Sequence, residues 1–410
     1  MTLSVENVVA KERVSSCTIC GSSALTTILE QSNIPVHQNL LYDSLPAALN
    51  CKRGNLRLES CNSCGLVFNS RFQSELLEYA QDYENSQDHS RIFLNHLKDV
   101  AEMLTRAHAL HKKRILEIGC GKGVFLKLIT AAGGNEGKGF DPSYEGELSP
   151  VPGLQFVREF FPGNEPWWHP DLIVCRHVLE HIAFPLPFLE TLRQAIGNQH
   201  VPVYFEVPNV SWIFENVAFW DIFYEHCNYF SAQSIERLFR QAGFDVCKIQ
   251  ESFAGQYLSV EAVPSIAVDG MAQQAHPQQQ EHSRPQPLRQ PETLNAAQFR
   301  SKCAGRQQTL KEEIERASAD GQTVAVWGAA AKGSTFLNLM DSSRQQVQFV
   351  VDINIKKQGC FIAGTGHKIV APNHLLSQPA QTILLMNPNY HDEVKALLQS
   401  LGAHSRLVRV

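Results

Sequence analysis

Long apolar runs are missing from this 410-residue sequence. No apolar stretch reaches the ~18–20 residues that a helix needs to cross a bilayer, so we expect no membrane partner. Residues 1–16, MTLSVENVVAKERVSS, lack the apolar core of a secretory signal. We therefore expect a cytoplasmic protein.

A strong excess of charge is missing as well. The formal net charge is −5 and the isoelectric point is near 6.3, which gives no basis for binding nucleic acid or an acidic membrane surface. Hydrophobic residues make up 43% of the chain, as in globular proteins. The length suggests two or three domains of ~100–200 residues each.

The cysteine pattern argues against a disulfide framework. Eleven cysteines are an odd number, and most stand alone, which is typical of a reducing compartment. Two pairs have CxxC spacing and can supply four thiolates to one Zn²⁺: Cys17 with Cys20, and Cys61 with Cys64. Four cysteine ligands leave no position for water, so the predicted zinc is structural. The alternative is four reduced thiols without metal.

Short apolar runs alternate with amphipathic stretches over much of the chain, which predicts an α/β fold with a mostly parallel, doubly wound sheet. Residues 73–111 are expected to form helices with a polar break at 85–89, and Ser231 is a plausible N-cap of a later helix. We divide the chain into a Cys-rich domain (1–72), a main α/β domain (73–263), a Gln/Pro-rich linker or loop (264–295) and a smaller α/β domain (296–410).

A glycine-rich turn in the main domain points to a nucleotide cofactor. The segment ILEIGCGKG follows a strand and opens a helix, and it carries Glu117, Gly119, Gly121 and Gly123. Glycines let the backbone approach a ligand at the carboxyl edge of the sheet. Asp141, at the end of the next strand, can accept hydrogen bonds from ribose hydroxyls. A dinucleotide site would have a glycine at Val124, so the pattern favours S-adenosylmethionine over NAD.

Polar residues of RHVLEHI (176–182) follow a later strand at the same edge. We expect Arg176 and His177 to contact the cofactor. His177 is also a candidate second base, although the segment is more simply read as the pocket floor and the start of a helix.

The glycine motif resembles that of the class I S-adenosylmethionine-dependent methyltransferases. The whole chain resembles the bacterial sugar C-methyltransferases of deoxysugar biosynthesis, through CNSCGLVF, LEIGCGKG, YEHCNYFS, GAAAKGSTFLN and VVDINIKKQGCFIAGTGH. The resemblance implies a zinc-binding N-terminal domain, a class I methyltransferase domain and a C-terminal Rossmann-like α/β domain. It also implies methylation of a carbon atom in a nucleotide-linked keto-deoxysugar.

The segment YEHCNYFS carries the candidate catalytic residues. In the family its second histidine is proposed to remove a proton beside a keto group, and the equivalent here is His226. Methyl transfer to carbon needs such a base, and an imidazole suits neutral pH. Glu225 is expected to orient that ring or hold a substrate hydroxyl, and Tyr224 to assist. The alternative is a histidine satisfied in a structural aromatic wall.

Further residues are assigned by the same resemblance. Tyr83 and Ser86 are expected to line the cofactor pocket, and Tyr79 and Tyr229 the substrate pocket. Lys332, at a strand-to-helix turn, is a candidate phosphate ligand, since helix N-termini attract phosphate. Asp352, which ends the next strand, could meet a ribose.

Two departures from the family leave the acceptor open. Phe223 stands where the family has tyrosine, and AGQYLSVEA (254–262) lacks an arginine that could meet a diphosphate. An O- or N-methyltransferase acting on a sugar or another small metabolite is therefore the alternative function. A non-catalytic scaffold is the third, and the intact glycine motif argues against it.

Overall fold

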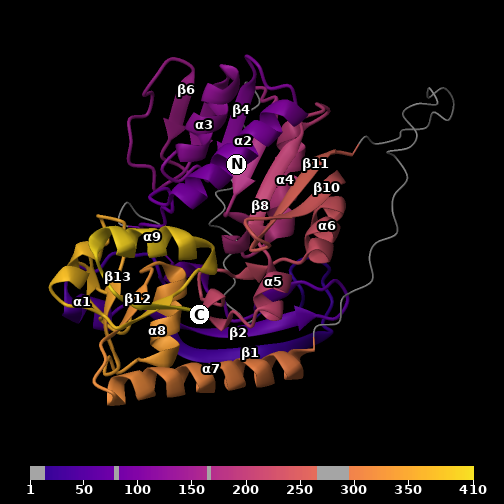
Figure 1. Cartoon of the computed structure of the whole chain (residues 1–410). Coiled ribbons are helices and arrows are strands. Elements are labelled where there is room, and N and C mark those ends of the chain that lie inside the picture. Colours follow the sequence, from indigo (N-terminus) through magenta and orange to yellow (C-terminus); the bar gives the residue numbers. More distant parts are fainter. Residues whose placement is uncertain (1–13, 78–82, 164–167, 266–294) are drawn as a thin grey trace.

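Three sheets organise the chain in the computed structural model, which describes residues 14–77, 83–163, 168–265 and 295–410 (Figure 1). Tyr79, Trp167 and most of the Gln/Pro-rich segment therefore lie outside the described residues. No helix among the described ones is both long and apolar enough to cross a membrane.

The N-terminal sheet is antiparallel. Its strands in spatial order are β1 (Leu25–Pro35), β2 (Arg53–Cys61), β3 (Val67–Asn69) and β9 (Asn228–Tyr229). Helix α1 (Leu45–Leu49) lies in the β1–β2 connection. The last strand comes from the middle of the chain, where Val67 pairs with Tyr229 and Phe68 with Asn228.

The central sheet has seven strands and is mixed rather than wholly parallel. Its spatial order is β10 (Phe244–Ser252), β11 (Tyr257–Pro264), β8 (Val203–Pro208), β7 (Leu172–Arg176), β4 (Arg114–Ile118), β5 (Glu136–Phe140) and β6 (Leu154–Val157). The strands from β8 to β6 are parallel, and β11 runs antiparallel to both β8 and β10. This arrangement confirms the predicted α/β class.

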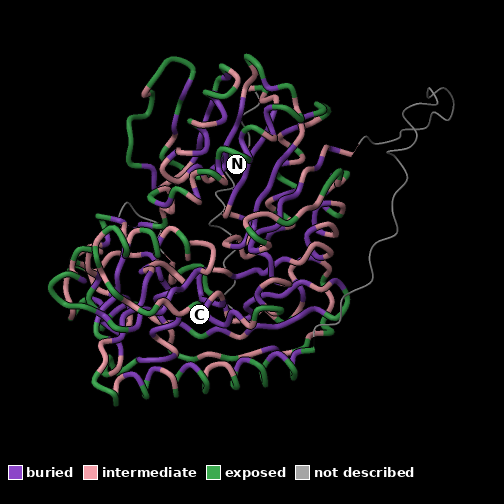
Figure 2. Tube along the Cα trace, in the orientation of Figure 1, coloured by how far each residue is buried: buried purple, intermediate pink, exposed green. Residues whose placement is uncertain are grey.

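Burial explains why the inner strands have continuous apolar sequences. All five residues of β7, LIVCR, are buried, because helices cover both faces of a parallel sheet (Figure 2). The helices of this domain are α2 (Arg91–Ala107), α3 (Val124–Gly133), α4 (Pro185–Ile196), α5 (Val210–Glu215) and α6 (Ala232–Gln241). Ser231 caps α6 as predicted, with Ser234 completing a capping box.

The C-terminal sheet is parallel, with β14 (Ile369–Val370), β13 (Val347–Val351), β12 (Val324–Trp327), β15 (Thr382–Leu385) and β16 (Arg406–Arg409) in that order. Its helices are α7 (Ala296–Ala319), α8 (Ala331–Met340) and α9 (His391–Leu401). Figure 1 shows α7 running along the outside of β1, and residues of both share one apolar core.

The prediction of a helix ahead of α2 is wrong for the described residues. Only a 3₁₀ turn, Ser74–Leu76, precedes residue 78, and the segment from Tyr83 onward is extended. Tyr83 forms a bridge with Leu40, and the Glu84 N–H donates to the Asn39 carbonyl at 2.9 Å. Pairing with this distant N-terminal segment overrides the local helical preference.

Candidate active site

A cleft of about 420 Å³ lies between the carboxyl edge of the seven-stranded sheet and the C-terminal sheet. This volume is within the range of small-molecule sites. It is lined by residues of the predicted cofactor edge and of the C-terminal domain. Those named from the sequence are Tyr83, Ser86, Glu117, Gly119, Gly121, Asp141, Arg176, His177, His226, Lys332 and Asp352.

The glycine-rich turn between β4 and α3 is held by Asp141. Gly121 has a φ of +52°, and its N–H donates to Asp141 Oδ2 at 2.8 Å. A Cβ at Gly121 would meet no protein atom within 4 Å, so the space over it belongs to the cleft. Gly123 is different, because a Cβ there would lie 2.5 Å from the Phe156 ring. Gly123 does not line the cleft and allows α3 to pack closely.

Glu117 lies at the floor of the turn. Burial raises the pKa of its carboxyl to about 8, Arg176 opposes this rise, and Asp141 adds to it. Its Oε2 is buried and has no hydrogen-bond partner among the described residues. A ligand hydroxyl would satisfy this acceptor, as the prediction of a ribose here requires.

Glu206, on β8, centres a buried charge network that the sequence analysis missed. Arg176 donates to its Oε1 at 3.1 and 2.7 Å, His177 Nε2 lies 3.2 Å from Oε1, and His96 Nε2 lies 3.0 Å from Oε2. Burial alone would raise the pKa of Glu206, but the Arg176 charge and the hydrogen bonds with His177 and His96 hold it well below its usual value. Within VPVYFEVP, the one carboxylate in an apolar strand was the available signal.

His177 has a strained backbone, with a φ of +54°. Burial would lower the pKa of its imidazole, but Glu180 and Glu206 raise it above the usual value. Its ring meets the Tyr257 ring edge-on, with the centroids 4.5 Å apart. Arg176 is thus held mainly by Glu206, whereas the His177 ring lines the cleft.

His226 is the residue of YEHCNYFS that reaches the cleft together with Phe223. Its ring lies 4.1 Å from the Phe223 ring and 4.8 Å from that of His181, measured between centroids. Burial lowers the pKa of His226 well below its usual value, and the nearby charges of His181, His177 and Lys332 lower it further. The ring is therefore neutral at physiological pH, which is the form that accepts a proton.

The other three candidates of this segment point away from the cleft. Tyr224 is fully buried, and its hydroxyl accepts from the Gln73 N–H at 2.9 Å. Glu225 Oε2 accepts from the Gln38 N–H at 2.9 Å. The Tyr229 hydroxyl bridges the N–H and carbonyl of Phe223, each at 3.0 Å. These contacts hold the loop that presents His226, and they connect it to the N-terminal domain.

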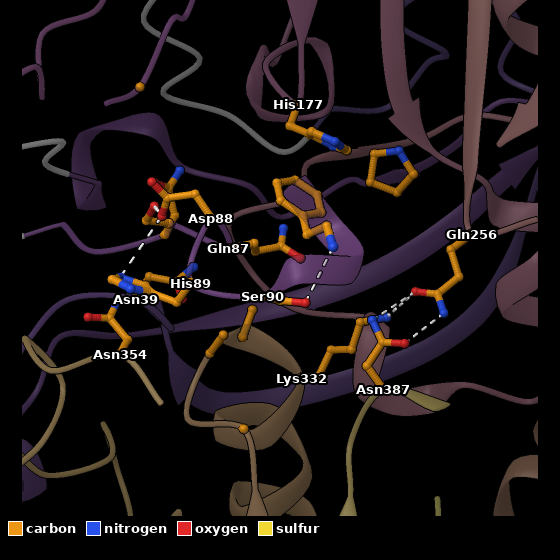
Figure 3. Close-up of a pocket in the computed structure, with 18 of the residues that line it drawn as sticks. Asn39, Gln87, Asp88, His89, Ser90, His177, Gln256, Lys332, Asn354 and Asn387 are labelled. Atoms are coloured by element: carbon orange, nitrogen blue, oxygen red, sulfur yellow. Dashed lines mark hydrogen bonds and ion pairs between the residues drawn. The ribbon is translucent and has the colours of Figure 1, made fainter. Parts of the chain in front are cut away.

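Lys332 spans the two domains across the cleft. Its Nζ bonds to Asp221 and lies 3.2 Å from Gln256 Oε1, and Gln256 is also paired with Asn387 (Figure 3). The 254–262 segment was noted only for a missing arginine, although Gln256 is its polar contribution to the cleft.

The C-terminal domain repeats the aspartate arrangement of the central domain. Asp141, after β5, accepts from the N–H groups of Gly121 and Ser143. Asp352, after β13, accepts from the N–H of Ala329 at 2.7 Å and of Asn354 at 2.8 Å. Each carboxylate therefore holds the turn after the neighbouring strand, and both face the same cleft.

The four predicted cysteine ligands come together in the N-terminal domain. Cys17 Sγ lies 3.4 Å from Cys64 Sγ, Cys20 Sγ lies 3.5 Å from Cys61 Sγ, and all four sulfurs lie within 4.8 Å of one another. Zn–S bonds of ~2.3 Å place tetrahedral sulfurs ~3.8 Å apart, so the cluster fits zinc. Hydrogen bonding with Cys64 lowers the pKa of Cys17 to about 5, toward the thiolate that metals bind.

The central sheet, the glycine turn and the acidic strand end define a class I S-adenosylmethionine-dependent methyltransferase. Residues 89–249 match the family described as "Methyltransferase domain". Residues 272–407 match the family described as "C-methyltransferase C-terminal domain". The chain is therefore an S-adenosylmethionine-dependent methyltransferase that carries a C-methyltransferase C-terminal domain.

A related sequence has the same extent. C-methyltransferase NovU of Streptomyces niveus is 24% identical over 393 residues, which cover 93% of this chain and 91% of that protein.

Several solved structures contain a similar segment. One is a SAM-dependent methyltransferase from Aquifex aeolicus, which is 13% identical with a TM-score of 0.31. The match covers 42% of this chain and 98% of that one. Magnesium protoporphyrin IX methyltransferase from Synechocystis has 15% identity, a TM-score of 0.35, and coverage of 44% and 88%. Likenesses this partial say nothing about the acceptor.

Proposed function

We propose that this enzyme methylates a carbon beside the keto group of a nucleotide-linked keto-deoxysugar, with His226 as the general base. One observation carries the proposal: a neutral imidazole, with its Nδ1 buried and without a hydrogen-bond partner among the described residues, lies in the cleft between the two domains. Proton removal from carbon requires such a group. An oxygen or nitrogen acceptor can lose its proton to water.

The cofactor side of the cleft is the glycine turn. The unpartnered Oε2 of Glu117, the open space over Gly121 and the carboxylate of Asp141 support binding of S-adenosylmethionine there. When bound, the cofactor supplies an electrophilic methyl group. Glu117 and Asp141 would accept hydrogen bonds from the ribose hydroxyls. Tyr83 and Ser86 would cover the ligand from the opposite wall.

The acceptor side would be formed by the C-terminal domain. Asp352 would accept a hydrogen bond from a ribose hydroxyl, and Lys332, which is paired with Asp221, would lie beside the acceptor at the start of α8. The ring of His177 would donate a hydrogen bond to the enolate oxygen that forms when His226 removes the proton. The cysteine cluster would hold a structural zinc ion, remote from this chemistry.

Solvent exchange tests the proposal without methyl transfer. The enzyme is incubated in D₂O with S-adenosylhomocysteine and a panel of nucleotide-linked keto-deoxysugars, and the proton beside the keto group is followed by NMR. We expect deuterium to enter with the wild type and not with His226→Asn. The exposed His169 provides a matched control, so His169→Asn should exchange normally.

Two outcomes would contradict the proposal. One is normal turnover of His226→Asn with only a lower melting temperature, which would show that YEHCNYFS has a structural role and not a catalytic one. The other is a product whose methyl group is attached to oxygen or nitrogen, which would establish the alternative function.

A further inference from the structure

Glu180 is a buried carboxylate that nothing described so far explains. It lies in the 3₁₀ turn Leu179–His181 after β7, is 1% exposed, and neither oxygen has a hydrogen-bond partner among the described residues. The nearest cation is His177, whose Nδ1 is 3.6 Å from Oε1, longer than a hydrogen bond. Burying a carboxylate without a hydrogen-bond partner is unfavourable, so its presence calls for a cation.

Two histidines complete a group of potential ligands around it. One ligand atom from each of Glu180, His181 and His226 lies within 4.8 Å of the other two. The His181 Nδ1 lies 2.9 Å from the Glu225 carbonyl and donates to it, which fixes the orientation of the ring. A metal-binding histidine is commonly oriented by such a bond through its other nitrogen.

The chemistry of these donors suits a divalent transition-metal ion. Two imidazoles and one carboxylate are ligands for Zn²⁺, Mn²⁺, Fe²⁺ or Co²⁺ rather than for Ca²⁺ or Mg²⁺. At bond lengths of ~2.1 Å, tetrahedral ligand atoms are ~3.4 Å apart. Ligand atoms that lie within 4.8 Å of one another would therefore close on the ion by shifts of at most ~1.4 Å. All three residues line the cleft, which leaves further coordination positions open.

We propose that Glu180, His181 and His226 form a second metal site, distinct from the cysteine cluster, and that its occupation inhibits the enzyme. Inhibition rests on the proposed role of His226, because a ring nitrogen that binds metal has no lone pair for a substrate proton. Metal binding itself does not depend on that role.

Binding is tested on the full-length protein with its cysteine site loaded with zinc and excess metal removed. Co²⁺ is added as a probe, and the visible absorption and bound metal are measured. We expect one further equivalent per chain with the spectrum of nitrogen and oxygen ligands. Glu180→Gln and His181→Gln should each weaken Co²⁺ binding at least tenfold. Glu190→Gln, which changes an exposed carboxylate on α4, should not.

The results separate the two parts of the inference. No further equivalent of Co²⁺, or equal binding by Glu180→Gln and wild type, overturns the site and identifies Glu180 as an internal partner of His177. Binding of Co²⁺ with unchanged or increased methyl transfer overturns the inhibition. Failure of deuterium exchange in metal-free enzyme would refute the role of His226 in catalysis while leaving the metal stoichiometry unaffected.

Discussion

Replacing Gly121 by alanine tests whether this residue contacts the ligand, and a control variant accounts for the effect on protein stability. The Cβ would enter space that no protein atom occupies within 4 Å, and the Gly121 N–H would still donate to Asp141. Gly134 offers a matched control at the other end of α3, because its φ is +60° and a Cβ there also meets nothing within 4 Å. Gly134 does not line the cleft.

The two alanine variants should be destabilised equally. A left-handed conformation costs an L-residue ~1–2 kcal/mol. For a domain of this size each kcal/mol lowers the melting temperature by ~2–4 °C, so both variants should melt ~2–8 °C below wild type. Only Gly121→Ala adds a methyl group against the cofactor. Forcing a methyl group into a packed contact costs ~1–3 kcal/mol, which corresponds to ~5- to 150-fold weaker binding.

Calorimetry with S-adenosylhomocysteine, together with thermal melting, measures both effects. We expect a large loss of affinity for Gly121→Ala and wild-type affinity for Gly134→Ala at matched stability. Equal affinity of the two variants would show that the glycine turn does not contact the cofactor.

Three further perturbations test other parts of the site. Because the pKa of Glu117 is about 8 in the free protein, and ribose hydroxyls favour the carboxylate, affinity for S-adenosylhomocysteine should rise from pH 6.5 to 8 and then level off. Calorimetry across this range should show no such rise for Glu117→Gln. Cys61→Ser should lower both zinc content and melting temperature, whereas Cys51→Ser, outside the cluster, should retain zinc by elemental analysis. His226→Asn should lower kcat by ~10²–10⁴ without weakening cofactor binding in calorimetry. Retained kcat would exclude it as the base.

Local sequence patterns predicted the parts of the fold that local interactions determine. The glycine-rich segment follows β4 and opens α3, and Ser231 caps α6, as predicted. Each depends on the spacing of apolar residues and turn formers within about ten positions. Each CxxC pair is likewise a local signal, although the cluster joins sulfurs that are 41 and 47 positions apart in the sequence.

Contacts between distant segments determined the rest. Adjacent side chains of YEHCNYFS face different surroundings because Gln38, Gln73 and β3 hold the loop from outside. No pattern within the loop indicates that Glu225 faces Gln38 while its neighbour faces the cleft. Likewise, Glu180 follows a strand in a way that suggests only a helix start, and its surroundings depend on His226, which lies in another segment.

The strand pair β3–β9 links the cysteine cluster to the loop that carries His226. β3 begins three residues after Cys64, and β9 begins two residues after His226. His226 is therefore attached to the N-terminal domain through paired backbone that begins beside the cysteine cluster. Loss of a bound zinc ion would loosen this pairing and displace the imidazole of His226, whereas the glycine turn, which Asp141 holds, would keep its shape. Removal of zinc from the cysteine cluster should therefore slow turnover, while the methyl donor still binds.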